Sequence, residues 1–171
     1  MAEILDKIPA GTKWAITSNV LASALVVRGE KVIAPVLGKL KWLEINNEVY
    51  GEGGKLMFPQ IKEEFKFPVR DATEAATFAM LALMLLMGPE TQSELIEATP
   101  ERAVVRTTKC PFWERYEENE VNPELIPCEI GHQAFCKEGF KAITPNVTHT
   151  LVKSRPRGDP YCEDVFEFKE E

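Results

Sequence analysis

Apolar residues in the first part of the chain recur at the spacing of a helix. Residues 12–27 place five apolar side chains near one helical face: Trp14, Val20, Leu21, Ala24 and Val27. Gly29 follows as a stop signal for this helix. Residues 30–44 continue the pattern as a second helix, which Pro35 is expected to kink or restart because proline cannot donate a backbone hydrogen bond.

The next segments alternate between turn signals and apolar runs. Residues 46–54 contain Asn-Asn and Gly-Glu-Gly-Gly, which predict a loop, and residues 58–65 predict a short helix that starts at Pro59. Asp71 is an expected N-cap with Glu74 as its partner three residues later, and Gly88 is the expected stop. The helix between them is apolar nearly all round, so we expect it at the centre of the core.

The second half of the chain changes to strand patterns. The expected elements are strands at residues 92–98 and 102–109, a helical turn at 111–118, a helix at 123–140 that Pro127 interrupts or starts, and strands at 147–154 and 161–169. This order predicts an α+β fold, with N-terminal helices packed on an antiparallel sheet from a ββαββ half. Without a linker or repeat, residues 1–171 are expected to form a single domain, helical over 1–90 and ββαββ over 91–171.

Charge and composition narrow the class of partner. The chain has 20 Lys and Arg against 27 Asp and Glu, a net charge of −7, which argues against binding nucleic acid through its phosphates. The longest apolar run, residues 75–87, is too short to cross a bilayer, and the N-terminus lacks the pattern of an export signal. We therefore expect a cytoplasmic protein, without a membrane or nucleic-acid partner, whose cysteines are reduced.

All four cysteines lie in the second half, and three residues form a Cys-x3-His-x3-Cys pattern. On a helix, this spacing puts Cys128, His132 and Cys136 on one face. Cys128 and Cys136 would then lie about 12 Å apart along the axis, whereas two thiolates on one zinc ion lie about 3.8 Å apart. A mononuclear site would therefore use one of these two cysteines, with His132 and Cys110 or Cys162. A site with all four needs a broken helix near Gly131 or a wider group such as an iron–sulfur cluster.

The predicted metal ligands are Cys110, Cys128, Cys136 and Cys162, and the predicted cofactor is an iron–sulfur cluster or zinc. Unrelated buried thiols, or one catalytic thiol with His132 or His149 as its base, are the alternatives.

Other residues are candidates for catalysis or for a ligand pocket. His132 can act as a general base because its ordinary pKa is near neutrality, and Asp159 is a candidate carboxylate base in a position that also favours a turn. Trp113 and His132 are expected to line an apolar pocket for a small organic ligand. His149 lies in the middle of a strand and is interpreted first as a hydrogen-bonded residue of the sheet.

The C-terminal pattern resembles a known family. The segment Thr108-Lys-Cys-Pro-Phe-Trp, Cys128 at a helix start, Thr150-Leu-Val-Lys and Gly158-Asp159-x-x-Cys162 are similar to the L-2-amino-thiazoline-4-carboxylic acid hydrolase family. A more distant resemblance is to vinyl-4-reductase small-molecule-binding domains. The resemblance covers roughly residues 70–169 and implies either hydrolysis of a cyclic C=N substrate or a sensor-type zinc held by three cysteines and a glutamate. By that likeness Cys128 and Cys162 match two thiolates, and the third falls at Ser154.

Two functions follow from these observations. The first is a metal- or iron–sulfur-cluster-binding domain with a small-molecule pocket, which acts as a sensor or accessory protein. The second is a hydrolase in which metal-activated water, or His132 with Asp159, attacks a cyclic amidine-like or thiazoline-type carbon. The expected partners are a small organic ligand and, as one option, a second copy of the chain in a homodimer.

Overall fold

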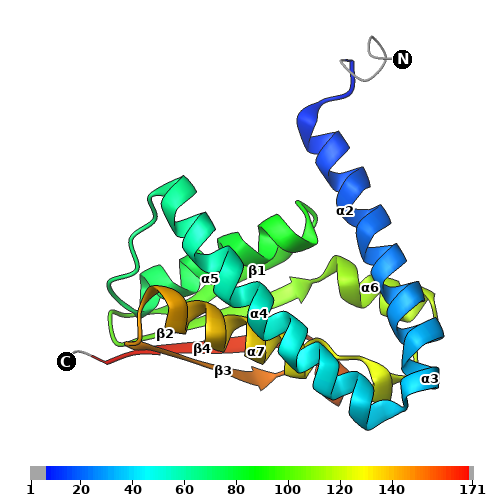
Figure 1. Ribbon diagram of the computed structural model, residues 1–171. Coiled ribbons are helices and arrows are strands. Elements are labelled where there is room, and N and C mark those ends of the chain that lie inside the picture. Colours follow the sequence, from blue (N-terminus) through cyan, green and yellow to red (C-terminus); the bar gives the residue numbers. More distant parts are fainter. Residues whose placement is uncertain (1–6, 170–171) are drawn as a thin grey trace.

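The computed structural model describes residues 7–169 and begins with a series of helices (Figure 1). These are α2 (Ala10–Val26), the π-helix η1 (Val27–Ile33), α3 (Ala34–Leu37), α4 (Lys39–Phe65) and α5 (Ala72–Met87). From α2 to α3 the backbone is continuously helical, and Gly38, with φ of 76°, breaks it before α4. Pro35 lies in the first turn of α3, which continues η1 without a gap, so the helix does not restart at this proline and the predicted helix over residues 30–44 is interrupted at Gly38 instead.

The second half forms the sheet and two further α-helices. Its elements are β1 (Gln92–Ala98), β2 (Arg102–Lys109), α6 (Pro111–Glu118), η2 (Pro123–Leu125), α7 (Cys128–Ile143), β3 (Val147–Lys153), η3 (Arg155–Arg157) and β4 (Cys162–Phe168). The strand order is β1-β2-β4-β3, and all neighbours are antiparallel. The predicted α+β class and its ββαββ order are confirmed.

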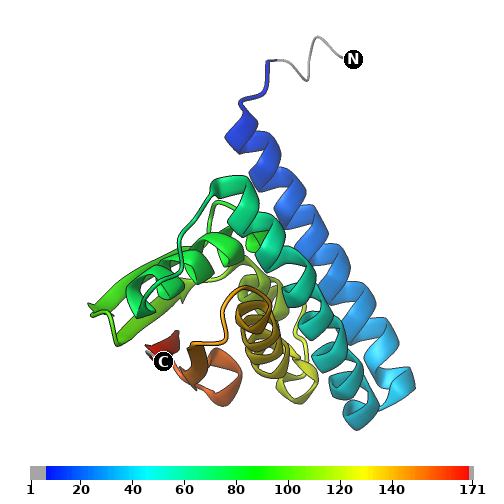
Figure 2. The same ribbon diagram turned by 60° about the vertical axis from the view of Figure 1, so that its left-hand side comes forward.

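Helices α5 and α7 cover the sheet, and α4 packs on α7 (Figures 1 and 2). The main core joins buried residues of α4, α5, α7 and the two central strands. At its centre the ring of Phe58 meets those of Phe78, Phe135 and Phe140 edge-on, with centroids 5.0–5.1 Å apart. Together these rings lock α4 and α5 onto α7.

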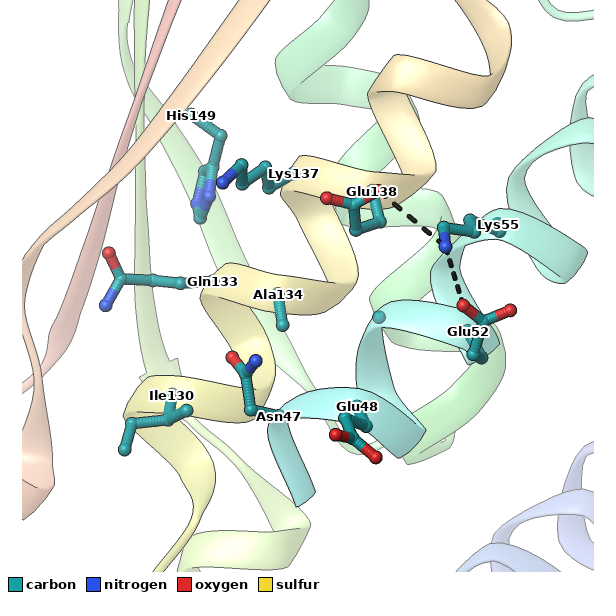
Figure 3. Close-up of a pocket in the computed structure, with 11 residues that line it drawn as sticks. Asn47, Glu48, Glu52, Lys55, Ile130, Gln133, Ala134, Lys137, Glu138 and His149 are labelled. Atoms are coloured by element: carbon teal, nitrogen blue, oxygen red, sulfur yellow. Dashed lines mark hydrogen bonds and ion pairs between the residues drawn. The ribbon is translucent and has the colours of Figure 1, made fainter. Parts of the chain in front are cut away.

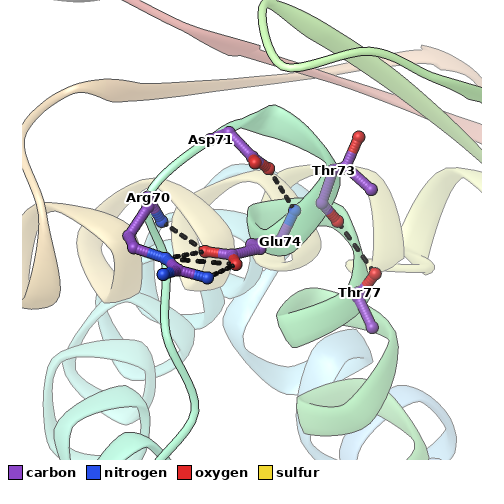
Figure 4. A network of polar contacts seen from close by, with 5 residues as sticks. All are labelled: Arg70, Asp71, Thr73, Glu74 and Thr77. Carbon is purple, nitrogen blue, oxygen red and sulfur yellow. Dashed lines mark hydrogen bonds and ion pairs between the residues drawn. The ribbon is translucent and has the colours of Figure 1, made fainter.

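The start of α5 is set by local hydrogen bonds (Figure 4). Asp71 Oδ1 accepts a hydrogen bond of 2.7 Å from the backbone N–H of Glu74. The Glu74 carboxylate in turn accepts from the backbone N–H of Arg70 at 2.8 Å and pairs with its guanidinium. Gly88, with φ of 101°, ends the helix. The predicted cap, helix and stop are thus confirmed.

Two predicted breaks in the N-terminal half are wrong. Gly29 does not end a helix, because η1 continues through it, and residues 46–54 belong to the long helix α4 rather than to a loop. An ideal Cβ at Gly29 would lie 2.9 Å from the Trp42 ring, and one at Gly54 would lie 2.2 Å from the Phe135 carbonyl oxygen. These glycines therefore allow helices to pack closely, and the favourable contacts override the local preference of glycine for turns.

The predicted interruption at Pro127 is confirmed, because η2 ends at Leu125 and Pro127 is the N-cap of α7, which begins at Cys128. Within residues 7–169, no helix combines the length and the apolar character that crossing a bilayer requires. The expectation about an export signal concerns in part residues 1–6, which lie outside the described residues.

The contact between α4 and α7 can be tested at two neighbouring glycines. We expect Gly54→Ala to lower the free energy of unfolding by about 3 kcal/mol, because its Cβ overlaps the Phe135 carbonyl. Gly53→Ala is the matched control, since its nearest atom would be 3.9 Å away, and alanine in a helix interior should stabilise by roughly 0.5–1 kcal/mol. Urea unfolding measures both, and equal effects of the two substitutions would contradict the close approach.

Candidate functional site

A polar cluster lies between α7 and the inner face of β3 and β4. His149 on β3 and Asp164 on β4 both have side chains that point away from solvent, 1% and 4% exposed. Antiparallel pairing of His149 with Phe166 and of Leu151 with Asp164 places the two polar residues diagonally on one face. Strand alternation thus directs both into the space under α7.

Helix α7 supplies the other members of the cluster. His132 and Cys136 are four residues apart, so they lie one turn apart on the same helical face, which points to the sheet. An adjoining face of α7 packs on α4, where Gly131 leaves room for the Tyr50 ring and Gly139 for the Phe58 ring. The predicted helical face is therefore confirmed for His132 and Cys136.

The Asp164 carboxylate is the hub of this cluster. His132 Nε2 donates to Asp164 Oδ1 at 2.7 Å, and His149 Nε2 donates to the same oxygen at 2.8 Å. The two imidazole rings meet edge-on at 5.1 Å, and Cys136 Sγ lies 4.0 Å from His132 Nε2. Within the described part of the chain, His149 Nδ1 is buried and has no hydrogen-bond partner.

The members of the cluster differ in their state of charge. Burial disfavours the Asp164 carboxylate, but the charge of His132 and the hydrogen bonds from both imidazoles outweigh it and hold the pKa below its ordinary value. Burial also opposes a charge on His132, yet Asp164 and Cys136 raise the pKa of this imidazole well above its ordinary value. For His149, burial lowers the pKa and the charge of His132 adds to the shift. The arrangement is thus an ion pair beside one neutral imidazole.

Three residues of the cluster have the spacing of metal ligands. One ligand atom each of His132, Cys136 and His149 lies within 4.8 Å of the others. In a tetrahedral zinc site, a sulfur and a nitrogen ligand are about 3.6 Å apart, close to the 4.0 Å between Cys136 Sγ and His132 Nε2. Among the described residues His149 Nδ1 has no hydrogen-bond partner, and Asp164 holds the other nitrogen of this ring, as carboxylates do behind metal-bound histidines. These residues fit a zinc-type ion.

The same contacts do not form a thiol–imidazole–carboxylate relay. In such a relay the nucleophile and the carboxylate contact opposite nitrogens of the imidazole, whereas Cys136 and Asp164 both face Nε2 of His132. Asp159 accepts a hydrogen bond of 2.8 Å from the backbone N–H of Ser154 and so stabilises the turn before β4. The carboxylate that contacts His132 is Asp164, not the predicted Asp159.

The other three cysteines lie in a second neighbourhood. Burial raises the pKa of the Cys128 thiol well above its ordinary value, and charges at Cys110 and Cys162 add to this shift, so the three thiols are close enough to interact. The Cys110 thiol donates to Met87 Sδ at 3.6 Å. Because α7 is continuous from Cys128, this cysteine lies about 12 Å along the axis from Cys136. The two cannot bind one mononuclear ion, and the four-cysteine set stays a prediction.

The zinc site implied by the family resemblance needs a third thiolate at Ser154. The hydroxyl of Ser154 is buried and donates to Glu129 Oε2 at 3.3 Å. Glu129 is also paired with Arg157 at 2.6 Å, which lowers the pKa of its carboxyl. The residues at this position therefore do not fit a three-thiolate zinc site.

A buried carboxyl adjoins the second group of thiols. Glu30, in the π-helix η1, is 5% exposed, and Tyr116 donates to its Oε1 at 3.4 Å. Glu30 Oε2 has no partner among the described residues. Burial raises the pKa of this carboxyl to about 7. Glu30 was not predicted to be functional, because its position on a helix gave no sign that its side chain points inward.

A groove of about 640 Å³ runs between α4 and α7 and reaches His149 (Figure 3). Its walls are mostly polar, and they include Asn47, Glu52, Lys55, Gln133, Ala134 and Lys137. Neither Trp113, which packs beside Tyr116, nor His132 lines this groove, and their role in a ligand pocket stays a prediction. His149 was predicted only as an alternative base or a residue of the sheet, and Asp164 was given no role from the sequence. The available signal was that Asp164, a charged residue, lies on the same strand face as Phe166 and Phe168.

Comparison with known proteins supports the fold and no family. No protein-family model and no curated protein matches the chain. A trafficking protein particle complex subunit 3 from Naegleria fowleri, covalently bound to palmitic acid, is similar with a TM-score of 0.62 and 11% identity over 91% of this chain and 96% of that one. The phenol-responsive sensory domain of the transcription activator PoxR, with phenol, has a TM-score of 0.52 and 8% identity over 90% and 74%. At these identities the likeness shows a shared α+β fold, and the hydrolase and reductase families stay predictions.

The raised pKa of Glu30 predicts a defined pH dependence of stability. Unfolding returns this pKa from about 7 to its ordinary 4.5, so the contribution of Glu30 is complete below pH 4.5 and is lost as pH rises through 7. Through Glu30, the free energy of unfolding of the native protein should fall by up to about 3 kcal/mol as the pH rises through this range, and we expect Glu30→Gln to remove that fall. Urea unfolding at pH 4.5 and pH 8 measures the difference. The exposed Glu64→Gln is the control, and a Glu30→Gln protein that keeps the native pH dependence would contradict this assignment.

Proposed function

We propose that this chain is a small-molecule-binding domain with a zinc-type metal centre, and that it acts as a sensor or accessory protein. The observation that carries the proposal is the convergence of His132, Cys136 and His149 within 4.8 Å around the buried Asp164. Imidazole and thiolate together suit zinc and related transition metals. An iron–sulfur cluster is less well supported, because this group supplies one thiolate and clusters are held mainly by several.

The small-molecule part of the proposal rests on the groove and on the similar structures. Both of those structures hold an organic molecule, palmitic acid in one and phenol in the other. In this chain the groove between α4 and α7 has room for a ligand of that size range and ends at His149. A ligand in the groove would therefore lie beside a residue of the metal centre, which is the coupling that a sensor needs.

The metal centre is tested by titration of the full chain with Co²⁺ and Zn²⁺ after dialysis against a chelator. We expect one equivalent to bind, with a thiolate-to-cobalt absorption band that Cys136→Ser abolishes. His149→Gln should weaken binding at least about 100-fold, because it removes a ligand, and Asp164→Asn about 10–100-fold, because it removes the group that orients the imidazoles. Circular dichroism of each variant confirms that it is folded.

Cys128→Ser and Cys162→Ser are the matched controls and should keep both the metal and the band. If these two variants lose the metal while Cys136→Ser retains it, the ion is bound by the second group of thiols and the proposal is wrong. A native protein that binds no metal would also refute it.

The ligand site is tested by filling the groove. Calorimetry with a panel of phenols and fatty acids, with phenol and palmitate included, should find at least one ligand of the native protein. Ala134→Phe should weaken its binding at least about 10-fold, because the ring would occupy the groove. Ala142→Phe, an exposed position on the same helix outside the groove, should leave the affinity unchanged. A panel without a ligand, or equal affinities for the three proteins, would argue against the groove.

A further inference from the structure

The outer side of the N-terminal helical segment is unusually apolar. Of the sixteen large hydrophobic side chains that are exposed among the described residues, ten lie between residues 16 and 40. The most exposed of them are Ile16, Val20, Leu21, Val32, Val36 and Leu40. We call the exposed aliphatic side chains of residues 16–40 the outer face. In Figures 1 and 2 the segment from α2 to α3 runs along the edge of the molecule, and within residues 7–169 these side chains stay exposed.

The area of the outer face matches that of a stable interface. From the exposed fractions, its ten side chains present on the order of 1,000 Å² to solvent, whereas a standard interface buries about 800 Å² on each partner. Contiguous apolar patches on monomeric proteins are usually limited to about 300–600 Å². The helical segment from Ala10 to Leu37 is also roughly 40 Å long, enough for an extended helix–helix contact.

The charges near the outer face favour an apolar protein partner over a membrane. The carboxylate of Glu30 is buried on the inner side, so residues 16–40 expose no acidic side chain. Of the three cations in this stretch, Lys31 donates to the Asn119 carbonyl at 2.6 Å and Lys39 lies 3.4 Å from Glu124, so these two are directed to the body of the same chain. The third, Arg28, is exposed beside the aliphatic side chains. The net charge of −7 further disfavours the anionic lipid surfaces that bind amphipathic helices.

We propose that the outer face is a homodimer interface in which the α2–α3 segments of two copies pack against each other. An aliphatic surface without acidic groups is complementary to itself, and a two-fold axis pairs each residue set with the same set on the second copy. Ala24 and Thr17 lie on α2 between the larger side chains and leave room for two helices to approach. The proposal is independent of the metal centre and of the groove.

Sedimentation equilibrium of the full chain at micromolar concentrations tests this proposal. We expect a dimer for the native protein. Val20→Glu and Val36→Glu should each raise the dissociation constant at least about 100-fold, because the two-fold axis buries two unpaired carboxylates per dimer. Val49→Glu is the matched control, since Val49 on α4 is as exposed as Val20, 62% against 63%, and lies outside the outer face. We expect Val49→Glu to leave the dimer unchanged.

Circular dichroism and urea unfolding accompany the measurement, and because the substituted side chains are exposed we expect folded variants. A native protein that is monomeric at these concentrations would overturn the proposal, as would a Val20→Glu protein that dimerises like the native one. Flotation with phosphatidylcholine–phosphatidylglycerol vesicles is the second measurement. Binding that Val20→Glu abolishes would assign the outer face to a membrane surface and also overturn the homodimer.

Discussion

The close packing of α4 on α7 is the contact that positions the helical half of the site, His132 and Cys136. Gly54 allows the Phe135 carbonyl to approach α4, and Gly139 allows the ring of Phe58 to lie against α7. Because α7 is held against α4 in this way, the adjoining face that carries His132 and Cys136 is presented to the sheet. A larger residue at either glycine would move α7, and the distances within the cluster would change with it.

The buried carboxylate of Asp164 distinguishes this cluster from an ordinary hydrophobic core. A single Asp164 oxygen accepts from two imidazoles, and the proton on His132 balances its charge. Such an ion pair is costly to bury unless each partner is hydrogen-bonded, yet here one imidazole nitrogen, Nδ1 of His149, has no partner among the described residues. In the proposed metal centre, a divalent cation would take the place of the proton on His132 and balance the charge of Asp164.

Local signals predicted the elements that local interactions determine. The cap of Asp71 and the stop at Gly88 depend on residues a few positions away, and both were predicted correctly. The glycines of residues 46–54 give the same local signal as a turn, but their role comes from Phe135, eighty residues later, which the sequence does not reveal. His149 and Asp164 likewise meet only through the register of β3 and β4, so the site could be predicted on α7 but not on the sheet.

The helical segment from α2 to α3 packs on the protein with its inner side and exposes aliphatic side chains on its outer face. Its inner side buries Ala22 and Val26 against the body of the protein and directs Glu30 to Tyr116, whereas its outer face remains aliphatic. A helix that is apolar on both sides is normally covered on both sides. The π-helix η1 joins the two sides, because the seven residues that turn Glu30 inward also carry Val27 and Val32 outward. Packing on the outer face would therefore restrain the same turn of helix that keeps the Glu30 carboxyl out of water.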